Sequence, residues 1–233
     1  NSFKKMKGLL FLVFITYVCG AEYESAGVML KVNLLDKETY IVFGLREDKY
    51  ILDWVGGKTE TYDANEVETA QRECTEEMGG HLKVCDALNA SSTRHEFMNP
   101  LTQKKIVVFE HVYEKRTDFY DDILDRVPKT LVLWDYKESK AFDGRAPVRK
   151  TFVTVGAVKE SELKRALCHL PSIDDVVAKE LMLTSHFSFL NPTNQYHRYS
   201  LRGFAAIVYY NVLCTQPPQF KNFVLGAPKP QMF

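Results

Sequence analysis

The first part of the chain shows apolar and β-branched runs separated by polar turns. Gly27–Leu34 and Tyr40–Leu45 have the composition of strands, and the charged segment 36–38 between them predicts a turn. A third run, Ile51–Val55, leads into a double glycine at 56–57, where a backbone can turn sharply or approach a ligand closely. The pattern therefore predicts strands that deliver the chain to a glycine corner.

Beyond the glycine corner the apolar residues fall at helical spacing. Asn65 is suited to cap a helix because Glu68 follows three residues later, and a second double glycine at 79–80 predicts the end of that helix. The apolar stripe of this helix comprises Val67, Cys74 and Met78.

The remaining two thirds of the chain predict further elements. Strands are expected at 82–88, 106–113, 131–134 and 151–155, and helices at 161–169 and 173–184. The apolar segment 204–213 predicts a buried strand or helix, and the polar segments 114–125 and 137–149 predict surface insertions. Together these elements predict a mixed β-sheet with one helix inserted early in the chain.

Length and composition favour a single folded domain. The chain has 233 residues, of which 45% are hydrophobic, and this is enough to bury a substantial core. Its formal net charge of zero gives no sign of a disordered chain or of a broadly cationic, nucleic-acid-binding surface. We expect residues 21–215 to form the domain and the proline-containing segment 216–233 to be a tail.

The first twenty residues resemble a signal peptide. A basic segment at 4–7 precedes an apolar run at 8–18, and small residues follow it. The run is shorter than a membrane-spanning helix needs, so we expect residues 1–20 to be a leader, the protein to be secreted, and no stable membrane span to remain. The alternatives are a retained anchor, or a buried strand at 9–18 in a cytoplasmic protein.

The cysteines are compatible with an oxidising compartment. Loss of Cys19 with the leader leaves an even set suited to disulfides. Asn89 begins a glycosylation sequon, which is used only in a secreted chain. The four remaining cysteines are Cys74, Cys85, Cys168 and Cys214.

Three glutamates crowd one arc of the helix predicted after the glycine corner. At roughly 100° per residue, Glu77 lies about 40° from Glu73, and Glu76 lies about 60° to the other side. Such crowding raises the carboxylate pKa values unless a cation compensates, and hard oxygen ligands favour Mg²⁺ or Mn²⁺. The alternative is an ordinary solvated acidic face of a helix.

The residues around these glutamates resemble the Nudix box. The run Arg-Glu, two residues, Glu-Glu, one residue, Gly is complete from Arg72 to Gly79, and it follows the double glycine at 56–57. The similarity to the Nudix family covers about residues 25–158. It implies a fold of the α/β (α+β) class, with a mixed β-sheet sandwiched between α-helices. It also implies hydrolysis of the diphosphate linkage between a nucleoside diphosphate and another group.

The resemblance also implies roles for individual residues. Arg72 would orient the preceding loop by pairing with an acid, and Asp63 is the matching position, although this loop is one residue longer than the family pattern. Glu60 and Glu66 are the alternative partners. Gly80 stands where the family has a hydrophobic residue. The implied ligands of a Mg²⁺ or Mn²⁺ ion are the carbonyl of Gly57 and the carboxylates of Glu73, Glu76 and Glu77.

Hydrolysis at such a centre needs a base that takes a proton from the attacking water. Within the helix we expect Glu76 to serve. The alternatives supplied by a later loop are Glu110, Glu114, Asp121 and Asp122.

Two basic residues are candidates for substrate binding. Arg46 ends the second predicted strand and Lys58 follows the glycine corner, so each can hold a phosphate or form a surface salt bridge. Trp54 is either a stacking platform for a nucleobase or a core residue.

The leading hypothesis is a pyrophosphohydrolase for nucleotide sugars, dinucleoside polyphosphates, ADP-ribose or similar nucleotides. An RNA cap hydrolase of the same fold is an alternative, and a non-catalytic Nudix-fold binding module is another. DNA is not expected as a partner. The residues that hint at an RNA channel are Tyr196, Arg198, Tyr199 and Arg202.

Overall fold

The computed structural model describes residues 23–46, 51–78, 82–88, 92–125, 152, 154–178, 181–184 and 198–214. Several expectations fall outside these ranges: the leader 1–20, the double glycine 79–80, the sequon at 89–91, the strand 131–134, the insertion 137–149 and the tail 216–233.

The described residues form a mixed α/β fold around one nine-stranded sheet. The strands follow the order β5-β6-β1-β2-β3-β9-β8, while β4 pairs with β1 and β7 pairs with β2. The parallel pairs are β1–β6 and β3–β9, so the sheet is mixed, as predicted. The strands are β1 Tyr23–Asn33, β2 Thr39–Arg46, β3 Ile51–Asp53, β4 Val55–Lys58, β5 Thr93–Met98, β6 Lys105–Tyr113, β7 Thr154–Lys159, β8 Leu181–Thr184 and β9 Arg198–Leu201.

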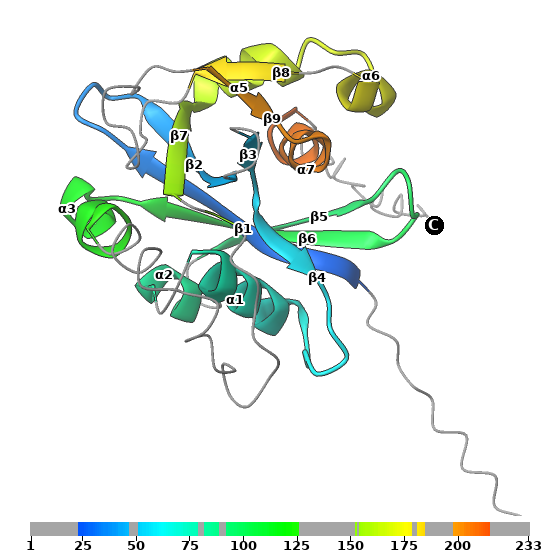
Figure 1. Ribbon diagram of the computed structural model, residues 1–233, viewed down its shortest axis with the longest axis horizontal. Coiled ribbons are helices and arrows are strands. Elements are labelled where there is room, and N and C mark those ends of the chain that lie inside the picture. The colour runs from blue at the N-terminus through cyan, green and yellow to red at the C-terminus, as the bar shows by residue number, and fades with distance from the viewer. Residues whose placement is uncertain are drawn as a thin grey trace, which may run out of the picture.

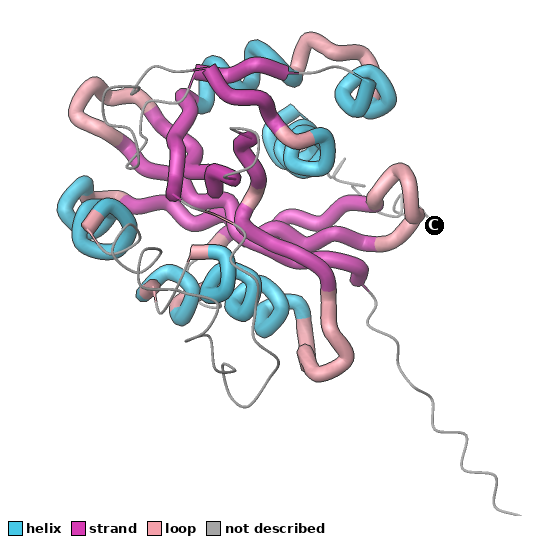
Figure 2. Tube along the Cα trace, viewed as in Figure 1, coloured by secondary structure: helices cyan, strands magenta, loops and turns pink. Residues whose placement is uncertain are grey.

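Helices cover both faces of the sheet (Figures 1 and 2). One face carries α1 Glu66–Glu77, α2 Lys83–Asp86, α3 Arg116–Phe119 and the π-helical turn η1 Tyr120–Leu124. The other face carries α5 Glu160–Leu167, α6 Ile173–Ala178 and α7 Gly203–Cys214. Each face buries its own hydrophobic cluster, so the expected sandwich of a sheet between helices is confirmed.

The sheet forks between β1 and β2. The first half of β1 pairs with β4 and its second half pairs with β2, whose own far end pairs with β3. Segment 51–58, which contains β3 and β4, therefore crosses from β2 to β1. The glycine corner lies at the β1 side of this crossing and leads into α1.

The segment 82–88, predicted as a strand, is the short helix α2. Two contacts with residues outside this segment stabilise the helix. The carboxylate of Asp122 accepts hydrogen bonds from the backbone N–H groups of Lys83 and Val84, and thereby caps the helix start. A disulfide joins Cys85 to Cys74 of α1. An apolar run this short is ambiguous without those partners.

Other expectations are confirmed in part. Segment 173–184, predicted as one helix, divides into α6 and β8. Segment 114–125, predicted as a surface insertion, folds into α3 and η1 and buries Phe119, Asp122 and Ile123. The predicted helix at 161–169 is α5, and the apolar segment 204–213 is the helix α7. The predicted strand at 151–155 is shifted to β7.

The four cysteines pair as two disulfides, Cys74–Cys85 and Cys168–Cys214. The second joins the end of α5 to the end of α7, and so ties the C-terminal helix to the rest of its face. None of the helices in the described ranges combines the length and the apolarity needed to cross a membrane.

Candidate functional site

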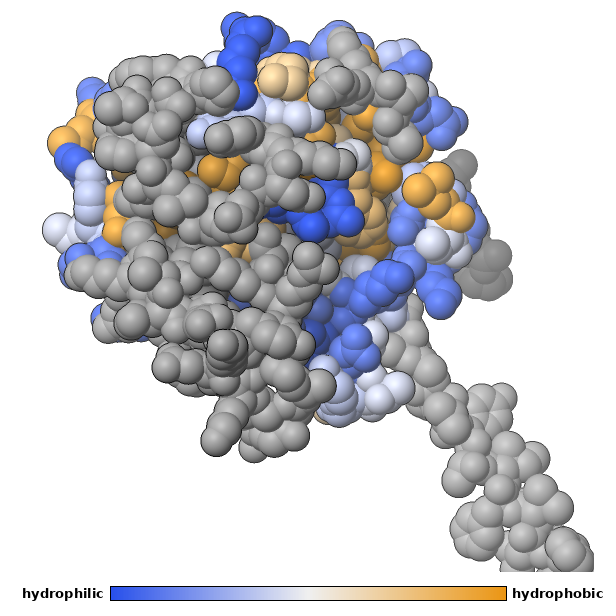
Figure 3. Space-filling model, in the orientation of Figure 1, coloured by the Kyte–Doolittle hydropathy of each residue, from blue (hydrophilic) through white to orange (hydrophobic). Residues whose placement is uncertain are grey.

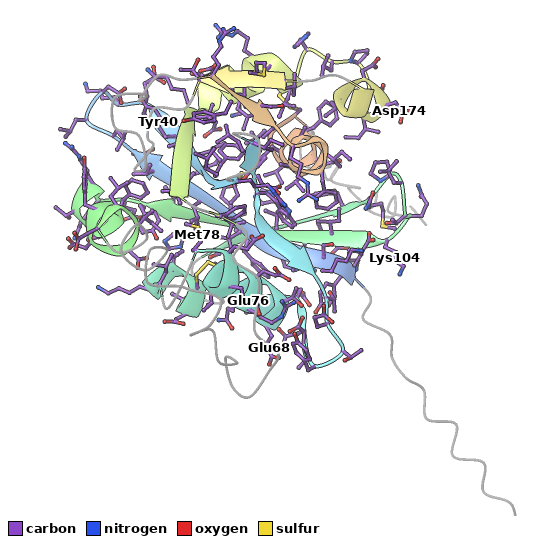
Figure 4. The ribbon with its side chains drawn as sticks, viewed as in Figure 1. Tyr40, Glu68, Glu76, Met78, Lys104 and Asp174 are labelled. Carbon is purple, nitrogen blue, oxygen red and sulfur yellow. A yellow bond between two sulfur atoms is a disulfide. The ribbon has the colours of Figure 1, made fainter. Side chains whose placement is uncertain are left out.

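The helix α1 begins as the sequence predicts. The side chain of Asn65 accepts a hydrogen bond from the backbone N–H of Glu68 at 3.0 Å, and the carboxylate of Glu68 accepts one from the N–H of Ala64 at 2.9 Å. These bonds satisfy N–H groups that a helix start leaves without partners. Cys74 and Met78 face the core, and Figure 4 shows Met78 on the sheet side of α1 and Glu68 on the outer side.

Arg72 joins the loop before α1 to the glutamates on α1. Its Nε and Nη2 donate to the two oxygens of Asp63 at 3.0 and 2.9 Å, and Nη2 also donates to the carbonyl oxygen of Lys58 at 2.8 Å. Its Nη1 donates to Glu73 at 2.7 Å and to Glu76 at 3.1 Å. All five guanidinium N–H donors therefore have an acceptor, which is what a buried arginine requires.

Asp63 is thus the acid that pairs with Arg72, in spite of the extra residue in the loop. Glu60 contacts Asp63 through its backbone N–H and carbonyl, and Glu66 pairs with Arg94 instead. Burial is the largest single effect on Asp63 and raises its pKa, but the hydrogen bonds from Arg72, Glu60 and Thr69 and the charge of Arg72 together outweigh burial, so the pKa of Asp63 is lowered. For Arg72, burial lowers the pKa. The surrounding acids Asp63, Glu73 and Glu76 outweigh burial and raise the pKa above its usual value.

The carboxylate of Glu73 occupies the space beside Gly57. A Cβ atom at position 57 would lie 2.5 Å from the Cδ of Glu73, so any other residue there would displace this carboxylate from its position. Burial raises the pKa of Glu73 to about 7, and the neighbouring charges of Glu76 and Asp63 add to that effect, while Arg72 opposes it. The glycine corner therefore forms a cradle for an acid that is poorly compensated.

Glu77 is held against the same corner. One of its carboxylate oxygens accepts a hydrogen bond from the backbone N–H of Gly56 at 2.7 Å. Burial raises the pKa of Glu77 well above its usual value, and the charges of Glu73 and Asp53 raise it further. Two of the three clustered glutamates thus have raised pKa values, as expected, with burial as the larger cause and crowding as a smaller one.

The predicted metal ligands lie together, but their side chains do not converge on one point. Within the described ranges, no group of three or more His, Cys, Asp or Glu side chains is arranged to hold a metal ion. Glu73 and Glu76 face Arg72, and Glu77 faces the N–H of Gly56. In this arrangement the guanidinium of Arg72 is the cation that faces Glu73 and Glu76, and the assignment of the three glutamates as metal ligands stays a prediction.

The residue types nevertheless fit a divalent cation. Three carboxylates supply hard oxygen ligands, two of them have raised pKa values, and Gly57 lies directly beside the carboxylate of Glu73. A Mg²⁺ or Mn²⁺ ion would offset the charge that burial now penalises.

The candidate bases from the later segment have structural contacts. Glu110 accepts from His95 at 2.8 Å and pairs with Lys31 at 2.9 Å, and these contacts lower its pKa to about 2 despite burial. Asp122 caps α2 and accepts from Tyr113. Glu114 and Asp121 are exposed, and among the described contacts none joins either to the cluster around Arg72.

Arg46 lies at the fork of the sheet, where its side chain contacts Asp53 and not the glutamates of α1. Its Nη1 is 3.3 Å from Asp53, and Nη1 of Arg202 is 2.6 Å from the same oxygen. Lys58 gives its carbonyl to Arg72 and has an exposed side chain. Arg46 and Lys58 therefore lie at opposite ends of segment 51–58.

Two aromatic residues considered for ligand contact belong to the core. Trp54 is 2% exposed and meets the ring of Phe204 edge to face, with the ring centroids 5.6 Å apart. Tyr199 is also 2% exposed, so it offers no ring to RNA. Tyr196 lies outside the described residues.

Tyr209 is a site neighbour that the sequence does not reveal. Its hydroxyl is buried and has no hydrogen-bond partner among the described residues. Burial raises its pKa, and the charges of Asp53 and Glu77 add to that effect, which places all three in one electrostatic environment. The apolar stretch around Tyr209 gives no signal of this, because the contact arises only when α7 packs on the sheet.

Comparison with known proteins returns Nudix structures. No protein-family model matches the sequence, and no curated protein matches it. A binary complex of the C. elegans Ap4A hydrolase is 14% identical, covers 38% of this chain and 64% of its own, and has a TM-score of 0.27. The NUDIX domain of Shewanella oneidensis NrtR complexed with ADP ribose is 12% identical, covers 42% of this chain and 64% of its own, and has a TM-score of 0.27. RenU, a Nudix hydrolase from M. smegmatis, is 13% identical, covers 40% of this chain and 64% of its own, and has a TM-score of 0.24.

The matched region thus spans just under two thirds of those chains. At such identities and TM-scores, neither their activities nor their ligands carry over to this chain. Its function has to be argued from its own residues.

Replacing Asp63 with alanine should destabilise the protein strongly. The change leaves a buried arginine without its bidentate partner, and loss of one member of a buried pair costs about 3 kcal/mol or more of unfolding free energy. Denaturant unfolding of Asp63→Ala and of the control Glu60→Ala measures this. Equal stability of the two variants would show that Asp63 is not the essential partner.

Stability without metal should fall as the pH rises. Because the folded-state pKa of Glu77 is raised above its unfolded value of 4.5, the folded state keeps a proton that the unfolded chain releases. The free energy of unfolding in a chelator should therefore decrease as the pH rises above 4.5. Glu77→Gln, which keeps an acceptor for Gly56, should flatten this decrease, and Glu66→Gln should not. Parallel pH curves for all three proteins would contradict the assignment.

Proposed function

We propose that this chain is a Mg²⁺- or Mn²⁺-dependent hydrolase of the Nudix type, which cleaves the diphosphate linkage of a nucleoside diphosphate joined to another group. The supporting observation is that Arg72 and the glycine corner gather Glu73, Glu76 and Glu77 at one end of α1. The sequence run from 72 to 79 adds the complete motif.

The proposal assigns separate tasks to these residues. When bound, a divalent ion lowers the pKa of an attacking water and neutralises the phosphate oxygens. Glu73, Glu76, Glu77 and the Gly57 carbonyl would hold it. Arg72 holds the preceding loop against α1 through its hydrogen bonds to Asp63 and Lys58, so the proposed metal ligands stay in place. Glu76 remains the proposed acceptor of the water proton.

A second candidate is a non-catalytic binding module. It is favoured by the contacts of Glu73 and Glu76 with Arg72, because a cation is already present in the cluster without any metal. The two proposals differ in one measurement, metal-dependent turnover.

Phosphate or nucleotide release from a panel of ADP-ribose, nucleotide sugars and dinucleoside polyphosphates should require Mg²⁺ or Mn²⁺. Glu77→Gln should lower turnover by about a hundredfold or more while leaving the fold intact, since it removes one metal-ligand charge. Glu66→Gln, on the same helix but paired with Arg94, is the matched control. Binding of panel members without any metal-dependent turnover would favour the binding module.

We also propose that the protein passes through the secretory pathway. Two disulfides among the described residues are typical of an oxidising compartment. Sequencing of the mature N-terminus, from protein made in its own cells, should show a start near residue 21. An intact residue 1 on that protein would contradict the proposal.

A further inference from the structure

The helix α7 carries a buried hydroxyl group without a partner. The buried residues of α7 are apolar except for Tyr209, which is 0% exposed, and in Figure 3 hydrophobic atoms gather at the position of this helix. The hydroxyl of Tyr209 has no hydrogen-bond partner among the described residues. A buried tyrosine hydroxyl usually finds a partner, because the loss of water without a replacement costs free energy of folding. The unpaired hydroxyl therefore points to an acceptor that reaches it in another state of the site.

The packing of α7 places Tyr209 at the fork of the sheet. Its ring packs against that of Phe43 on β2, with the ring centroids 4.7 Å apart, and the next residue of β2, Gly44, pairs with Asp53. Arg202, just before α7, donates to the carboxylate of Asp53 at 2.6 Å. Tyr209 follows Arg202 by seven residues, which is close to two helical turns. Both residues therefore lie on the side of the helix that faces Asp53.

The carboxylate of Glu77 reaches the same fork from the other face of the sheet. Figure 1 shows α7 and α1 on opposite sides of the sheet. From α1, Glu77 accepts the backbone N–H of Gly56, which lies on the same crossing segment 51–58 as Asp53. The charges of both acids raise the pKa of Tyr209, and the charge of Asp53 also raises the pKa of Glu77. The three groups therefore lie within electrostatic reach of one another, although they come from α7, β3 and α1.

The two acids near Tyr209 differ in the donors that they have. Asp53 accepts three hydrogen bonds, two from arginine side chains and one from the backbone N–H of Trp54. Within the described ranges, the one hydrogen bond that Glu77 accepts comes from the N–H of Gly56. A carboxylate offers about four acceptor positions. Glu77 is thus the buried acid at the fork with the most acceptor capacity left for a further donor.

Tyr209 has the properties of a fixed donor. Burial raises the pKa of Tyr209, so the hydroxyl keeps its proton near neutral pH. The Cys168–Cys214 disulfide ties down the end of α7, and a hydrogen bond of 3.0 Å from the N–H of Arg202 to the carbonyl of Leu52 ties down its start. The helix that carries the ring is therefore held at both ends, whereas the longer side chain of Glu77 has more rotatable bonds with which to turn toward it.

We propose that Tyr209 is a positioning residue for Glu77, whose carboxylate accepts a hydrogen bond from the Tyr209 hydroxyl when it holds the divalent ion. This inference rests on the proposed function, because it concerns one of the proposed metal ligands. A hydrogen bond of this kind orients a ligand, and its loss weakens metal binding. The inference gives α7, which lies far beyond the motif in the sequence, a direct part in the metal site.

The test measures the affinity of the full chain for Mn²⁺ alone by calorimetry. Tyr209→Phe removes the hydroxyl and keeps the ring that packs against Phe43. It should weaken Mn²⁺ binding about tenfold or more, because the hydrogen-bond partners of metal ligands contribute that much to affinity. Tyr210→Phe is the matched control, since it removes the hydroxyl of the next residue on α7, which contacts the carbonyl of Leu170. Mn²⁺ binding by Tyr209→Phe as tight as that of Tyr210→Phe would overturn the proposal.

Stability without metal separates a positioning role from a structural one. In a chelator, Tyr209→Phe should be at least as stable to denaturant as the wild type, because the hydroxyl that it removes has no partner in the metal-free protein. A clear loss of stability in the chelator would assign a structural role to the hydroxyl and overturn the proposal.

A double-mutant cycle identifies the acceptor. In a Glu77→Ala background, Tyr209→Phe should no longer change the Mn²⁺ affinity, because the acceptor is gone. An equal effect in both backgrounds would assign the hydroxyl to another acceptor, against the proposal. A wild type that binds no Mn²⁺ would remove the proposed function together with this inference, whereas a wild type that binds Mn²⁺ as tightly as Tyr209→Phe does would remove the inference alone.

Discussion

The guanidinium of Arg72 is the contact on which the candidate site depends. It is buried, so each of its five donors must find an acceptor, and it finds them on the loop at Lys58 and Asp63 and on α1 at Glu73 and Glu76. Among the described residues it is the cation that contacts both Glu73 and Glu76. Together with the hydrogen bond from Gly56 to Glu77, this guanidinium sets the position of the glycine corner relative to α1.

The parts of this site that the sequence predicts are the local ones. The cap at Asn65, the buried stripe and the pairing of Arg72 with Asp63 depend on residues close together in the chain, where spacing determines geometry. The direction of the glutamate side chains is not local. It depends on which cation lies nearest, and in this structure that cation is Arg72. The contact of Arg202 with Asp53 and the position of Tyr209 near Asp53 and Glu77 arise only from long-range packing of the C-terminal segment.

The same division applies to the fold. Apolar runs predicted β1, β2 and β6, and helical spacing with a cap predicted α1, whereas β5 and β9 were missed because exposed polar residues interrupt them. The run 82–88 has the composition of a strand, but Asp122 caps it as a helix from nearly forty positions away. The aromatic and acidic composition of 114–125 suggested a surface, yet Phe119 and Ile123 complete the core under α1.

A metal ion at the proposed site would compete with Arg72 for Glu73 and Glu76, and the contacts of Arg72 are compatible with both. The Nε and Nη2 edge of the guanidinium binds Asp63 and Lys58, while Nη1 alone contacts Glu73 and Glu76. The two glutamates can therefore turn toward a metal ion without releasing the loop. Arg72 would lose two acceptors and keep three of its hydrogen bonds. The contacts of Arg72 with Asp63 and Lys58, which hold the loop beside α1, would then persist when Glu73 and Glu76 turn away.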